Sequence, residues 1–143
     1  MTKSKFIIGI DPDVEKSGVA IQKDGNIEVK TLSFFEIYDY LKFYQFRIEK
    51  PIVYIECGYL NKSNWHVNST TNNRVSGQIG QRTGANHEVA KKLCEMCEYL
   101  GLEHIKIKPT SRKLDAKTFK QITGITSILN QDQRDSVMLI YGR

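Results

Sequence analysis

Two short apolar runs constrain the fold of this chain most strongly. The first, Lys5–Asp11, reads KFIIGID, and the second, residues 51–56, reads PIVYIE. Short runs of this kind are typical of strands that are buried on both faces of a sheet. Each run ends in an acidic residue, Asp11 or Glu56, where an unpaired buried charge is costly. Either acid alone can be explained as the start of a turn, whereas the two together suggest a site.

The first part of the chain favours an antiparallel meander. Residues Gly18–Gln22 and Ile27–Leu32 have strand character, and the intervening DGN at 24–26 is a hairpin signal. Residues 33–48 then change period, with apolar side chains at three- and four-residue steps and Ser33 as a candidate N-cap. This pattern predicts three strands followed by an amphipathic helix.

The second part alternates strands and helices. After the strand at 51–56, residues 57–84 are polar and lack periodicity, which favours a functional loop. We expect a helix over Gly84–Leu100 ended by Gly101, a strand at 104–109, a basic helical stretch at 111–124 and a last helix capped by Asn130. Such alternation favours parallel pairing. The prediction is one α/β domain over 1–143, with a five-stranded mixed sheet (a three-strand antiparallel meander plus two parallel strands) flanked by helices.

Composition narrows the class of protein. The hydrophobic fraction of 40% is sufficient for a core, and no apolar stretch reaches the length of a membrane span. The N-terminal apolar run is too short for a signal peptide, so we expect a soluble, cytoplasmic protein with no membrane partner. The net charge of +5 suggests a polyanionic partner. Three cysteines favour buried, reduced thiols over disulfides.

The last helix adds two acids to those that end the strands. Asp132 and Asp135 are three residues apart, so a helix presents both carboxylates on one face. Their place in a first helical turn also suits the helix dipole, which is the purely structural interpretation of this pair. Four carboxylates at two strand ends and one helix face require a compensating positive charge, and Mg²⁺ prefers such oxygen ligands.

In order and context, these four acids resemble the RuvC family of Holliday-junction resolvases, within the RNase H-like superfamily. The matching segments span nearly the whole chain: IIGIDPDVEKSGVAI, VYIECGY, GQRTGANHEVAKKL and QDQRDSVMLI. The resemblance implies an RNase H-like fold, with Asp11, Glu56, Asp132 and Asp135 as catalytic ligands of two Mg²⁺ ions, for which Mn²⁺ can substitute. Asp13 departs from the family, which usually has Gly there, and its role stays open between metal binding and solvent contact.

Basic and aromatic residues lie between Glu56 and Asp132 in the sequence. Lys113 and Lys117 resemble the family's active-site lysines by position, and Lys113 is the preferred catalytic candidate. Tyr59 stands where the family has an aromatic residue at the junction, although it can equally anchor a loop. The other expected DNA contacts are Arg74, Arg82, Arg112, Lys117 and Lys120. The basic stretch is equally well explained as a solvated face.

The resemblance implies a Mg²⁺-dependent endonuclease that resolves four-way DNA junctions by paired nicks leaving 5′ phosphates. Paired cuts across a two-fold junction imply a homodimer. Three alternatives stay open: a nuclease for other branched DNA, for flaps or for RNA; a non-catalytic nucleic-acid binder; and an actin-like ATPase. The last needs two such domains, so no nucleotide cofactor is expected.

Overall fold

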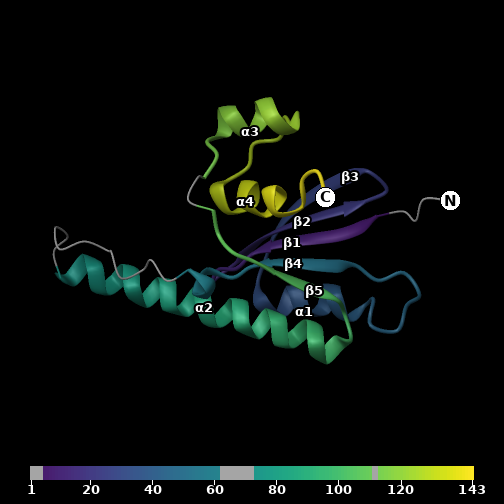
Figure 1. The fold of residues 1–143 in the computed structure, drawn as a ribbon, viewed down its shortest axis with the longest axis horizontal. Coiled ribbons are helices and arrows are strands. Elements are labelled where there is room, and N and C mark those ends of the chain that lie inside the picture. The colour runs from purple at the N-terminus through teal and green to yellow at the C-terminus, as the bar shows by residue number, and fades with distance from the viewer. Residues whose placement is uncertain (1–4, 62–72, 111–112) are drawn as a thin grey trace.

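The five predicted strands form a single mixed sheet (Figure 1). A computed structural model describes residues 5–61, 73–110 and 113–143, and for residues 73–79 only the backbone. The strands are β1 (Phe6–Asp11), β2 (Ser17–Lys23), β3 (Asn26–Leu32), β4 (Ile52–Glu56) and β5 (His104–Ile107). Their order is β3-β2-β1-β4-β5, with β1, β2 and β3 antiparallel and β4 and β5 parallel to β1. The predicted five-stranded mixed sheet, with an antiparallel meander and two parallel strands, is therefore confirmed.

Local sequence signals explain the turns and caps of these elements. Asp24 and Gly25 both have positive φ, as the predicted two-residue hairpin between β2 and β3 requires. Ser33 caps α1 (Phe34–Lys42) and Asn130 caps α4 (Gln131–Ile140), each in a reciprocal capping box. Gly101 ends α2 (Asn73–Leu100) in the left-handed conformation.

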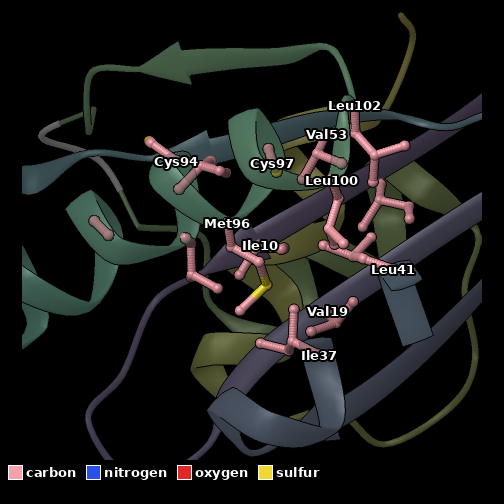
Figure 2. Close-up of a cluster of buried hydrophobic side chains, with 14 of the residues drawn as sticks. Ile10, Val19, Ile37, Leu41, Val53, Cys94, Met96, Cys97, Leu100 and Leu102 are labelled. Carbon is pink, nitrogen blue, oxygen red and sulfur yellow. The ribbon is translucent and has the colours of Figure 1, made fainter. Parts of the chain in front are cut away.

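Helices cover both faces of the sheet (Figure 1). On one face lie α1 and α2 (Asn73–Leu100), and β4 leads into a short 3₁₀ turn, η1 (Gly58–Leu60). The larger core fills the space between this face and the two helices, and Figure 2 shows its side chains from β1, β2, β4, α1 and α2. Cys57, Cys94 and Cys97 are buried free thiols in this core, as predicted. On the other face α4 packs against β1 and β2, and α3 (Ala116–Thr123) lies outside it.

Three helix boundaries differ from the prediction. The helix α2 begins at Asn73, so residues 73–83, which we expected in a loop, are helical. This segment extends beyond the sheet (Figure 1), and apart from Val75 and Ile79 its residues are polar or glycine, so it lacks a continuous apolar stripe that would reveal it.

The other two differences shorten a helix. The helix α1 ends at Lys42 instead of continuing to Ile48, because the sheet offers no surface for its last apolar side chains: Phe46 is 91% exposed and Ile48 fully exposed. The helix α3 begins at Ala116, because the Asp115 side chain caps it by accepting a hydrogen bond from the Thr118 amide. Residues 113–115 of the predicted helical stretch are therefore not helical, and residues 111–112 lie outside the described part of the chain. None of the helices in the described part of the chain has the length and apolar character of a membrane span.

Candidate functional site

Two neighbouring parallel strands deliver the first two acids. Asp11 is the last residue of β1 and Glu56 the last residue of β4. Because Ile10 is paired with Ile55 in the parallel register, the two acids leave the sheet side by side at its carboxyl edge. The edge predicted from the sequence therefore brings Asp11 and Glu56 together.

The helix α4 brings the other two acids to the same edge. Glycines make its close approach to the sheet possible, because a Cβ at Gly9 or Gly18 would collide with the backbone of Ser136 or Asp132. Carboxylate oxygens of Asp11, Asp132 and Asp135 consequently lie within 4.8 Å of one another, a spacing that one metal ion could bridge. Asp135 is buried, whereas Asp11 and Asp132 are partly exposed.

Lys113 joins Glu56 to this carboxylate cluster. Its Nζ lies 2.9 Å from Asp135 Oδ2 and 3.3 Å from Glu56 Oε1. Burial alone would lower the pKa of Lys113, but the Asp135 and Glu56 carboxylates hold it above its ordinary value. Lys113 is thus a fixed positive charge between two predicted catalytic acids.

Gln131 also contacts the carboxylate cluster, which the sequence did not reveal. Its side-chain amide donates a 2.7 Å hydrogen bond to Asp135 Oδ1 from one turn earlier on α4. With Lys113 on Oδ2, both oxygens of Asp135 have a partner and the carboxylate is fixed in orientation. A Gln four residues before an Asp is the signal that could have suggested this contact.

The acids are crowded enough to resist ionisation. Burial, followed by the charge of Glu56, raises the pKa of Asp11 from 3.8 to about 8. Burial also raises the pKa of Glu56, against the opposing effect of Lys113. For Asp132, burial and the nearby Asp13 carboxylate raise the pKa. A cluster of hard oxygen donors with this surplus of negative charge fits Mg²⁺ or Mn²⁺.

Asp13, whose role the sequence left open, forms an ion pair. Its Oδ2 accepts from Arg82 at 3.0 Å, and its Oδ1 accepts from the Glu15 amide at 2.9 Å. Arg82 lies on α2, 69 residues away, and was predicted to contact DNA. A second link between the same segments is the 2.9 Å hydrogen bond from the Val14 amide to Asn86 Oδ1. The loop after β1 is therefore held to α2 beside the acids.

A small polar cleft lies between the acids and α2. It has a volume of about 170 Å³, and its lining includes Asp11, Glu56, Asn86 and His87. The imidazole of His87 lies against Gly58, where a Cβ would come within 3.0 Å of it. No local sequence signal indicates that His87 lies beside the acids, because this depends on how α2 packs against the sheet edge.

The other residues that were predicted to contact DNA lie in several different elements. Tyr59 lies in η1 and packs on the larger core, with its ring 6.4 Å from that of His87 and 5.3 Å from Lys91 Nζ. Lys117 and Lys120 are exposed on α3. Arg74 lies in α2 but its side chain is outside the described residues, as is Arg112 altogether.

No protein-family model matches the chain, and no curated protein matches it. Among solved structures, the chain is similar to T. thermophilus RuvC in complex with Holliday junction substrate. The identity is 15%, the match covers 94% of this chain and 89% of that chain, and the TM-score is 0.48. Support for a function must therefore come from the residues of the site itself.

Proposed function

We propose that the protein is a divalent-metal-dependent endonuclease that cuts the phosphodiester backbone of branched DNA. The observation that supports this most is the convergence of Asp11, Asp132 and Asp135 within 4.8 Å, with Lys113 between Asp135 and Glu56. A purely structural role does not explain why the pKa values of Asp11, Glu56 and Asp132 are all raised at one sheet edge, where burial and neighbouring carboxylates increase the cost of charging each group.

Asp11, Glu56, Asp132 and Asp135 would hold two Mg²⁺ ions. When bound, such ions activate water, stabilise a leaving 3′ oxygen and neutralise phosphate charge. Lys113 binds a phosphate oxygen electrostatically once its acidic partners are occupied. Gln131 keeps Asp135 aimed at the cluster. Water, and not a side chain, would attack the phosphorus, and because the 3′ oxygen would leave, the products would carry a 3′ hydroxyl and a 5′ phosphate.

The proposed substrate is the four-way junction, which the resemblance of the sequence motifs supports. In this proposal the protein acts as a cytoplasmic homodimer, so that two sites make paired cuts across a two-fold substrate. Tyr59 stacks on an unpaired base at the crossover. The basic contacts to the DNA backbone come from Arg74, Arg82, Arg112, Lys117 and Lys120.

Cleavage by carboxylate variants tests this function. We expect Asp11→Asn and Asp135→Asn each to lower cleavage of a four-way junction in Mg²⁺ by more than about a hundredfold, because even partners of metal ligands contribute 10–100-fold. DNA binding should survive, since it depends mainly on basic residues. Asp39→Asn, an exposed acid on α1, is the matched control and should cut normally.

The substrate panel separates the alternatives. Four-way, three-way, flap and linear DNA and an RNA–DNA hybrid are incubated with the wild-type protein, with Mg²⁺ or with EDTA. Preferential cleavage of the four-way junction supports the proposal. Preferential cleavage of a flap or of the hybrid would support a nuclease with the same metal site but a different substrate. Undiminished cutting by Asp11→Asn would refute the assignment of the site, and binding without any cutting would favour a non-catalytic binder.

A further inference from the structure

A second and larger hollow adjoins the acids on the side of α4. This groove, of about 330 Å³, shares Glu56, Lys113 and Asp135 with the carboxylate cluster and continues along α4 to Arg143. Its volume is at the lower end of the range for sites that enclose a small organic ligand. Because it is continuous with the cluster, a strand whose phosphate lies on the acids passes its entrance.

The walls of the groove are mainly apolar. Met138 and Leu139 lie three and four residues after Asp135, so α4 presents all three on one side, about 4.5–6 Å apart along its axis. Ile107 at the end of β5 and Leu114 belong to the same lining. Met is a flexible, polarisable side chain that adapts to flat aromatic surfaces. The middle of the groove therefore suits a flat, weakly polar ring.

Two basic side chains also line the groove. Lys108 follows β5 in the chain, and Arg143 follows α4. Arg143 is held in place, because its guanidinium lies 5.0 Å from the Tyr54 ring and its Nε donates a 2.7 Å hydrogen bond to the Leu139 carbonyl. A ring-binding groove between cations and a phosphate-cutting centre has the character of a nucleotide subsite.

We propose that this groove receives an unstacked base of the strand being cut, one nucleotide from the phosphate that lies on the acids. The inference rests on the proposed nuclease function and adds a specificity determinant to it. Enzymes that extrude a base gain selectivity from the cost of unstacking, which is lowest where pairing is already interrupted. A base held here would favour cleavage near a junction, and the groove's fit would influence which base is accepted.

Fluorescence of 2-aminopurine tests this directly. The probe replaces one base at a time on each side of the branch point of a four-way junction, and the wild-type protein is added with Ca²⁺ in place of Mg²⁺, so that binding is measured apart from cutting. We expect a several-fold rise at one position only. Replacing that nucleotide with an abasic analogue should slow cleavage in Mg²⁺ by about tenfold, since the stacking contribution is lost.

A pair of matched variants locates the bound base. Ile122→Trp places a bulky ring at the groove from a residue that is 47% exposed, and Ile128→Trp makes the same change at a fully exposed residue outside the lining. We expect Ile122→Trp to abolish the fluorescence rise while junction binding persists, and Ile128→Trp to behave as wild type.

Each other outcome has a defined meaning. If the wild-type protein binds every probe-containing junction and none shows a rise in fluorescence, the inference is overturned, whatever the variants do. A rise that survives Ile122→Trp at full size would place the base elsewhere, such as on Tyr59, and would also overturn it. A rise that Ile122→Trp removes, in a protein that cuts no nucleic acid in Mg²⁺, would support the base site and refute the nuclease function.

Discussion

Asp11 is the carboxylate that its surroundings perturb most. Burial and the neighbouring acids raise its pKa from 3.8 to about 8, so the folded protein retains a proton that the unfolded chain releases above pH 4. By linkage, the folded state binds more protons than the unfolded state between these values, and the contribution of Asp11 to stability falls as pH rises from about 4 to about 8. The metal-free site is therefore least stable under alkaline conditions.

The variant Asp11→Asn should remove this loss of stability at high pH. In EDTA we expect its Tm to equal that of the wild type near pH 4.5 and to exceed it at pH 9 by several degrees, at about 2–4 °C per kcal/mol. In saturating Mg²⁺ the order should reverse, because only the wild-type site gains full binding energy. Thermal melts at three pH values, with and without Mg²⁺, measure both effects. An unchanged difference across pH would mean that Asp11 is not the titrating group.

At the scale of elements, the position of α4 decides whether the acids meet. Its first turn lies directly on β2, where a Cβ at Gly18 would come within 3.0 Å of the backbone of Asp132. Gln133 adds a 3.0 Å hydrogen bond from α4 to Thr31 on β3. The geometry of the site thus depends on backbone contact between a helix and a sheet.

We expect Gly18→Ala to push the start of α4 away from the sheet, at a cost of about 1–3 kcal/mol in the free energy of unfolding. Asp132 would move with it, so the Mg²⁺-induced rise in Tm should shrink as well. Gly84→Ala, within α2 where a Cβ meets no atom of another element within 4 Å, is the control and should stabilise by about 0.5–1 kcal/mol. Urea unfolding and Mg²⁺ titration of both variants provide the comparison, and equal responses would contradict the packing explanation.

At the scale of the whole molecule, the proposed function assigns separate roles to the basic side chains of the site and to those of α3. The net charge is +5, although the acids gather at one edge of the sheet. The lysines of α3 lie on the same face of the sheet as α4, and α1 lies on the opposite face (Figure 1). Binding and cleavage should therefore respond to different residues.

Lys120→Ala should weaken junction binding and reduce the slope of log affinity against log salt by about 1. Lys113→Ala should lower the cleavage rate far more than affinity, because its charge is already shared by Glu56 and Asp135. Lys42→Ala, on the far side of the sheet in α1, serves as the matched control and should change neither quantity. Binding isotherms at several salt concentrations, together with cleavage rates, measure the effect of each variant on affinity and on catalysis separately. Identical behaviour of Lys113→Ala and Lys120→Ala would favour a merely solvated basic face.

The sequence by itself determined the elements and the acids. Apolar runs that end in Asp11 and Glu56 identify buried parallel strands and the edge they share, since burial and periodicity are local properties of a segment. The hairpin, the caps at Ser33 and Asn130 and the paired spacing of Asp132 and Asp135 are likewise encoded within a few residues of each other.

Only the tertiary structure decided which side chains surround those acids. Arg82 reaches Asp13 across 69 residues, and Lys113 reaches Glu56 across 57, so neither contact leaves a trace in local spacing. The helical segment at 73–83 was missed because its sequence is mostly polar and glycine-rich and lacks a continuous apolar stripe. Long-range pairing depends on how elements pack, which is a property of the sheet and its helices together and not of any one segment.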